Sequence, residues 1–176
     1  MNKTSFLFLL TLIAFAAINY FYGNTTILGI FGFLLICLSL ILGPVSMIFN
    51  IHLIEPRRAV GIAAFVFVLF HFIGRIELIT TVPITIPTVA ILVILTLTSS
   101  DYAIKILGPV LWKNIQRLTY LVFIFSAIHF LNFSNYNPVE LFVSGVVILT
   151  IILQVIGFFV RRAKHASHQN AQQPQG

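Results

Sequence analysis

Two histidines, His71 and His129, are the residues of this sequence whose type and surroundings point most directly to chemistry. His71 is the only side chain that must hydrogen-bond in the stretch AAFVFVLFHFIG, and a similar pattern recurs around His129 in LVFIFSAIHFLNF. An imidazole in apolar surroundings can ligate a metal, relay a proton or hydrogen-bond to a neighbouring helix. The choice between these roles depends on the solvent that the two stretches meet.

The composition indicates an integral membrane protein. Apolar residues make up 59% of the 176 residues and charged residues 8%, with a mean hydropathy of +1.06, which excludes an ordinary soluble domain. Windows of about 20 apolar residues predict membrane-spanning helices. The sequence therefore predicts an all-α membrane protein, a bundle of six transmembrane helices at residues 6–22, 27–49, 59–79, 83–99, 115–133 and 139–160.

The elements outside these spans are short. Residues 1–162 are predicted to form one transmembrane domain, and residues 163–176, with a polar Gln-rich end, a disordered cytoplasmic tail. Between spans four and five, SSDYAIKILGP predicts a short interfacial helix that Ser99 or Ser100 caps and Gly108 ends. The N-terminal run also fits a cleaved signal peptide, but its apolar continuation favours a retained helix.

The basic residues predict the orientation, because cytoplasmic loops carry an excess of Lys and Arg. Nine of the ten fall on one side of the predicted bundle, and only Arg75, close to Glu77, falls on the other. We therefore expect a multi-pass protein of the cell membrane with both termini in the cytoplasm. The net charge of +6 then faces anionic membrane lipid and gives no reason to expect a nucleic-acid partner.

This orientation places the two histidines at one depth. The spans that carry them run in the same direction. His71 lies 13 residues beyond Arg58 and His129 lies 12 beyond Arg117. At a rise of 1.5 Å per residue they stand about 20 and 18 Å above the inner boundary. Two imidazoles at one level suit the two axial positions of a single heme iron between parallel helices.

Two longer stretches resemble a known family. The runs EPRRAVGIAAFVFVLFHF and LTSSDYAIKILGPVLWKNIQRLTYLVFIFSAIHF are similar to the ferric reductase-like transmembrane domain. Within it, they are most similar to the heme-binding membrane subunit of bacterial periplasmic methionine sulfoxide reductase systems. The likeness covers residues 28–160. It implies b-type heme held between helices, electron transfer at a bacterial inner membrane, and His71 and His129 as the outer heme ligands.

One position departs from the family pattern. Gln116 stands where the family has a further histidine, 13 residues before His129, and Arg57 lies at the corresponding inner level of the other helix. An amide is a poor iron ligand beside an imidazole, so the sequence predicts one heme b per chain, in the outer half of the membrane. Arg57 and Arg58 are expected to contact a heme propionate or a membrane lipid.

The leading functional hypothesis is a membrane b-type cytochrome, an electron-transfer subunit of an oxidoreductase rather than a complete enzyme. Its donor would be quinol from the bilayer or a separate flavoprotein, because the sequence has no nucleotide motif and does not indicate a flavin of its own. Its acceptor would lie outside, as a partner reductase subunit or ferric iron. The alternative is a non-redox polytopic protein, an assembly factor or small transporter, whose two histidines hydrogen-bond or relay protons.

Overall fold

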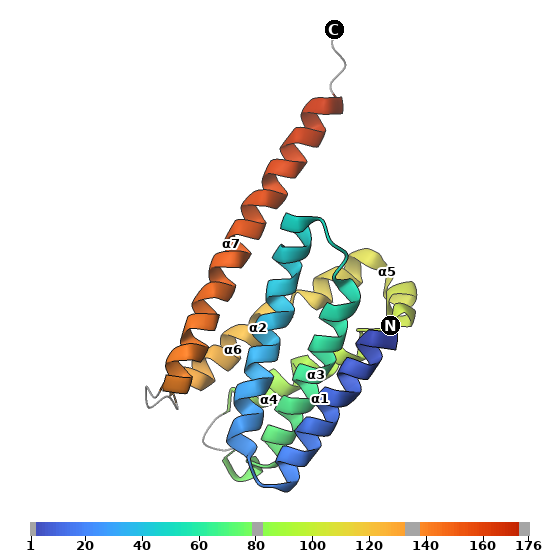
Figure 1. Ribbon diagram of the computed structural model, residues 1–176. Coiled ribbons are helices and arrows are strands. Elements are labelled where there is room, and N and C mark those ends of the chain that lie inside the picture. The colour runs from blue at the N-terminus through green and yellow to red at the C-terminus, as the bar shows by residue number, and fades with distance from the viewer. Residues whose placement is uncertain (1–2, 79–82, 133–137, 173–176) are drawn as a thin grey trace.

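The computed structural model describes residues 3–78, 83–132 and 138–172, and all regular structure in these ranges is helical. Figure 1 shows a bundle with α7 extending past the other helices toward the C-terminus. The predicted all-α fold is confirmed. The elements are α1 (Lys3–Phe21), α2 (Thr25–Phe49), α3 (Ile54–Ile73), the 3-10 helix η1 (Ile76–Leu78), α4 (Thr85–Leu97), α5 (Asp101–Gln116), α6 (Thr119–Asn132) and α7 (Pro138–Gln172).

Four helical segments of the described chain are long and apolar enough to cross a membrane. They are α2, α3, the α5–α6 segment Asp101–Asn132, and α7 as far as Lys164, and they match the second, third, fifth and sixth predicted spans. The first and fourth predicted spans correspond to shorter apolar helices. The 13 residues of α4 reach only about 20 Å, against a hydrocarbon core of about 30 Å. The count of six spans therefore stays a prediction.

The last helix continues into the part of the chain predicted as a tail. α7 ends at Gln172, so the backbone of residues 163–172 is helical. Residues 173–176, the rest of the predicted tail, lie outside the described residues. α7 passes through residue 162 without a break, and the domain boundary at that residue stays a prediction.

α2 is the central helix, and it packs most extensively against α3 and next against α7. Small residues bring α2 and α3 close together. A Cβ atom added at Gly32 would lie 2.9 Å from a methyl group of Val68, and Ala63 and Ala64 of α3 are buried. Inside a membrane, close packing of this kind is a main source of helix association. This close contact, which we call the α2–α3 seam, therefore fixes the rotation of α3 and the direction of the side chains that α3 carries.

α3 and α6 run in the same direction through the bundle (Figure 1). They make little direct contact with each other, whereas α2 and α4 each pack against both. The two helices that carry the histidines thus face each other across a space that α2 and α4 border.

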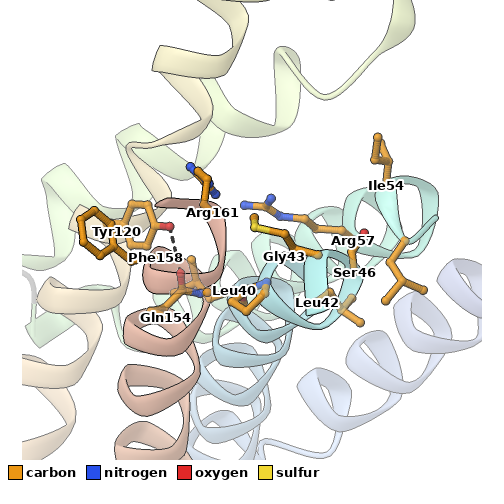
Figure 2. Close-up of a pocket in the computed structure, with 14 residues that line it drawn as sticks. Leu40, Leu42, Gly43, Ser46, Ile54, Arg57, Tyr120, Gln154, Phe158 and Arg161 are labelled. Atoms are coloured by element: carbon orange, nitrogen blue, oxygen red, sulfur yellow. Dashed lines mark hydrogen bonds between the residues drawn. The ribbon is translucent and has the colours of Figure 1, made fainter. Parts of the chain in front are cut away.

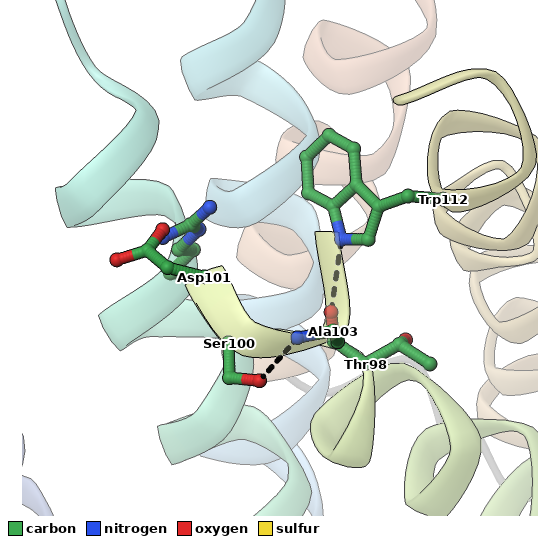
Figure 3. A network of polar contacts seen from close by, with 6 residues as sticks. Thr98, Ser100, Asp101, Ala103 and Trp112 are labelled. Carbon is green, nitrogen blue, oxygen red and sulfur yellow. Dashed lines mark hydrogen bonds and ion pairs between the residues drawn. The ribbon is translucent and has the colours of Figure 1, made fainter. Parts of the chain in front are cut away.

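α5 turns the chain between α4 and α6. Ser100 caps it by accepting the Ala103 N–H at 3.0 Å, and the Trp112 indole donates to the Thr98 carbonyl at 2.9 Å (Figure 3). The helix breaks at Gly108, whose φ of 74° and ψ of 157° favour glycine. The predicted cap and break are confirmed, and a second helical segment completes α5 beyond the break.

Candidate functional site

A cavity of about 340 Å³ between α3 and α6 brings His71 and His129 together. Their ring centroids are 6.2 Å apart and their ring planes cross at 71°. We call it the histidine cavity. Its lining comes from α2, α3, α4, α6, α7 and the residues next to them: Thr26, Gly29, Ile30, Phe33, Val68, His71, Phe72, Arg75, Ile84, Thr85, Thr88, Ser126, His129, Phe130 and Glu140.

The position of His71 is fixed by the first turn of α2. Its Nδ1 lies 2.7 Å from the backbone oxygen of Thr25. A carbonyl oxygen can only accept, so Nδ1 carries the hydrogen and donates it. Nε2 is then the ring nitrogen with an available lone pair. A metal-bound histidine commonly has this arrangement, because the second hydrogen bond orients the ring and raises its basicity.

Gly29 lets α2 approach the His71 ring. A Cβ atom at this position would lie 2.9 Å from both Cε1 and Nδ1 of the ring, closer than real contacts allow. The ring therefore lies directly against the backbone of α2. Thr25 and Gly29 stand one helical turn apart, so they meet the same ring from one face of α2.

The first turn of α2 also fixes the side chain of Arg75. Its Nε donates to Thr25 Oγ1 at 2.9 Å and its Nη2 to Thr26 Oγ1 at 3.0 Å, and the side chain lines the histidine cavity. Sequence reasoning treated Arg75 only as the cation on the less basic side. Arg75 follows the end of α3 at Ile73, so helical spacing from His71 does not reveal its contact with the first turn of α2.

The spacing of the two rings fits a heme held from both sides. Imidazoles that bind one iron from opposite faces have centroids about 6 Å apart, the sum of two bonds of about 2 Å and about 1 Å from each nitrogen to its ring centre. The observed separation is 6.2 Å. Two imidazoles within largely apolar walls suit a macrocycle with a metal at its centre, and the charged residues of the lining are Arg75 and Glu140.

The residues predicted at the inner level lie elsewhere. Arg58 pairs with Asp101, at 2.6 Å between Nη1 and Oδ1. Gln116 donates from Nε2 to Thr98 Oγ1 at 3.1 Å. Arg57 lines a second cavity, which does not include Gln116. The structure therefore does not bring Arg57 and Gln116 into one site.

This second cavity, which we call the arginine cavity, has a volume of about 240 Å³ (Figure 2). It shares no lining residue with the histidine cavity. Since Arg57 lies in the first turn of α3 and His71 in its last turn, the two cavities lie toward opposite ends of this helix. The lining residues are Leu40, Leu42, Gly43, Pro44, Ser46, Met47, Leu53, Ile54, Arg57, Tyr120, Gln154, Gly157, Phe158 and Arg161.

A proline in α2 shapes the arginine cavity. Pro44 has no N–H, so the carbonyl of Leu40, four residues earlier, loses its usual helical donor. Gln154 of α7 replaces it by donating from Nε2 to the Leu40 oxygen at 2.7 Å. The Tyr120 hydroxyl in turn donates to Gln154 Oε1 at 3.0 Å (Figure 2). These two hydrogen bonds join α2, α6 and α7 in one wall of the arginine cavity.

Comparison with known proteins finds relatives named protein-methionine-sulfoxide reductase heme-binding subunit MsrQ. The chain is 34% identical over 119 residues to that of Agrobacterium fabrum strain C58, which is 59% of this chain and 55% of the relative. It is 28% identical over 142 residues to that of Brucella ovis, covering 72% of this chain and 64% of the relative. The chain thus spans between about half and two thirds of the relatives' length.

No family model and no solved structure matches the chain. The predicted resemblance to the heme-binding subunit is nevertheless confirmed by these relatives, which match most of the chain. Together with the four long apolar helices, the matches show a multi-pass membrane protein that is similar to the MsrQ heme-binding subunits.

Proposed function

We propose that this protein is a membrane b-type cytochrome and serves as the electron-transfer subunit of an oxidoreductase. The observation that carries the proposal is the pair of imidazoles, 6.2 Å apart across one cavity, with His71 oriented through its Nδ1 by the Thr25 carbonyl. Relatives that are named as heme-binding subunits support the same cofactor. His71 and His129 are the residues that we propose would hold the heme iron.

The heme, when bound, supplies one-electron redox chemistry. If His71 and His129 both hold the heme iron, the group would suit electron transfer rather than oxygen binding. The Thr25 carbonyl holds the His71 ring in its ligating tautomer. Apolar side chains such as Phe33 and Phe130 line the cavity, and apolar surroundings of this kind help to set the reduction potential of a heme.

We propose that Arg75, rather than Arg57 or Arg58, faces an acidic edge of the macrocycle. Arg75 lines the histidine cavity, whereas Arg57 lines the other cavity and Arg58 already has Asp101 as its partner. An arginine that two threonine hydroxyls hold in place can meet a carboxylate with little loss of side-chain freedom.

The donor we propose is quinol, with a flavoprotein as the other candidate. One heme in the outer half cannot carry an electron across about 30 Å of hydrocarbon alone, so a donor that reaches it from within the bilayer is favoured. The relatives are named as reductase subunits, which favours a partner reductase over ferric iron as the acceptor on the outer side.

We propose the orientation that the basic residues predict, with both termini in the cytoplasm of a bacterial inner membrane. A reporter fused after Gly176 should behave as a cytoplasmic protein, because the Lys and Arg residues concentrate on that side. Labelling of that terminus from the exterior would contradict the proposed orientation.

The decisive test of the function is the heme content of the purified full chain. We expect reduced-minus-oxidised absorbance of a low-spin b-type cytochrome, and a pyridine hemochromogen assay that gives one heme per chain. Reduction of this heme by a soluble quinol analogue in detergent would support the proposed donor. A chain that folds but binds no heme when heme is supplied would contradict the proposal and favour the non-redox alternative.

A further inference from the structure

Two arginines from distant parts of the sequence reach into the arginine cavity. Arg57 belongs to the first turn of α3 and is partly buried, while Arg161 belongs to α7 and is exposed. Figure 2 shows their side chains extending toward each other. Both side chains line the same cavity, so two permanent positive charges face one space. None of the fourteen described residues that line the cavity is acidic.

This arrangement is costly unless an anion joins it. A guanidinium does not give up its proton in a protein, so two of them facing one partly buried space repel each other. The next residue of α3 shows the usual solution, since Arg58 pairs with Asp101 at 2.6 Å. The lining of the arginine cavity supplies no such carboxylate, so the balancing negative charge is expected to come from outside the lining.

The packing of the arginine cavity also holds Arg57 in place. A Cβ atom at Gly43 would lie 3.5 Å from Nη1 of Arg57, so the guanidinium lies against the backbone of α2. α7 crosses α2 closely, since a Cβ atom at Gly157 would lie 3.0 Å from Pro44. Lys164, which is outside the lining, ties α7 to α2 by donating to the Met47 carbonyl at 3.0 Å.

We infer that the arginine cavity binds a phosphate group, carried by an anionic phospholipid headgroup or present as free phosphate. Guanidinium groups match the geometry and charge of phosphate oxygens. Apolar residues of the same lining, such as Leu40, Leu42 and Phe158, lie beside the two arginines and suit the glycerol and acyl part of a lipid. A neutral quinol ring would leave the two positive charges unbalanced. The inference does not depend on heme binding.

The test measures the thermal unfolding midpoint of the full chain in detergent. Three probes are added separately: dioleoylphosphatidylglycerol, dioleoylphosphatidylcholine and inorganic phosphate. We expect the anionic lipid to raise the midpoint of the wild type by several degrees in a saturable manner, because it binds the folded state. The double variant Arg57→Gln/Arg161→Gln should lose most of this shift. Arg162→Gln, a neighbouring arginine outside the cavity lining, should keep it.

The probes identify the source of the phosphate. A shift with the anionic lipid alone assigns the site to a lipid headgroup, and an equal shift with inorganic phosphate alone assigns it to free phosphate. Both results must depend on Arg57 and Arg161. The inference is wrong if no probe shifts the wild type, or if Arg162→Gln loses as much of the shift as the double variant.

A second variant covers the case in which the double glutamine variant does not unfold cooperatively. Arg57→Lys/Arg161→Lys retains both charges but replaces each planar guanidinium by an ammonium group. This variant should therefore keep a reduced shift of the unfolding midpoint. A shift equal to that of the wild type would show a charge effect without guanidinium recognition and would overturn the site as described. Heme absorbance of these variants should stay unchanged, which separates this test from that of the cytochrome function.

Discussion

The histidine cavity and the arginine cavity lie toward opposite ends of α3, and the same helix supplies a different kind of side chain to each. The histidine cavity offers neutral nitrogen donors within walls that are mostly apolar, and Arg75 is held at its edge by threonines. The arginine cavity offers two permanent charges and a tyrosine–glutamine pair. An imidazole can be neutral and a guanidinium cannot, so the two ends of α3 suit the metal and the anion that we propose for them.

The largest effect is expected from removing either imidazole. His71→Ala and His129→Ala should each abolish heme binding or reduce it to a small fraction, because each variant leaves the iron without one axial ligand. The low-spin absorbance should disappear in both. His52→Ala is the matched control, since His52 lines neither cavity. A wild-type spectrum in both variants would show that the two histidines are not the ligands.

A large effect is also expected from filling the space beside the His71 ring. Gly29→Val adds a side chain whose Cβ would lie 2.9 Å from the ring, so the imidazole must move away from the Thr25 carbonyl. Heme content should fall several-fold, with a shift from low-spin toward high-spin absorbance. Gly145→Val is the control, because a Cβ there meets nothing within 4 Å. Equal heme content in the two variants would contradict the close contact.

A moderate effect is expected at the cation of the histidine cavity. Arg75→Gln should weaken heme retention a few-fold during gel filtration and lower the reduction potential, because a nearby positive charge favours the reduced iron. Since Arg75 is exposed, solvent should screen much of this effect. Redox titration of the wild type, Arg75→Gln and Arg162→Gln measures it. An unchanged potential and unchanged retention would remove Arg75 from the site.

The smallest effect is expected from placing a histidine at position 116. Gln116→His should leave the count at one heme per chain, because the Gln116 side chain points to Thr98 and Arg57 faces the arginine cavity. The hemochromogen assay against protein concentration decides the count. A second heme in this variant would show that the inner level can assemble a site, and that the two ends of α3 differ less than proposed here.

Part of this arrangement follows from the sequence. Composition indicates helices in a membrane, and counting residues from the basic boundary places His71 and His129 at one level. The structure brings these two residues together, while their role as ligands stays a prediction. Ser100 and Gly108 act through the local backbone, so their cap and break could also be predicted from the residues alone.

Contacts between distant segments could not be predicted. The roles of Thr25 and Gly29 arise where α2 crosses α3, and no periodicity within α2 reveals which ring it will meet. Arg57 and Arg161 line one cavity although they are far apart in the sequence. The sequence alone therefore suggested a shared role for Arg57 and its neighbour Arg58 instead. The length of α4 was also missed, because a hydropathy window counts apolar residues and not helical turns.

The 71° crossing of the two imidazole planes has a consequence for the electrons of a bound iron. Were these two rings to hold a heme iron at this angle, they would act almost equally on its two d orbitals of π symmetry. The ferric form would then be expected to show a strongly anisotropic electron paramagnetic resonance signal at low field. Because the α2–α3 seam and the Thr25 carbonyl set the angle of the His71 ring, helix packing would determine the magnetic ground state of the metal.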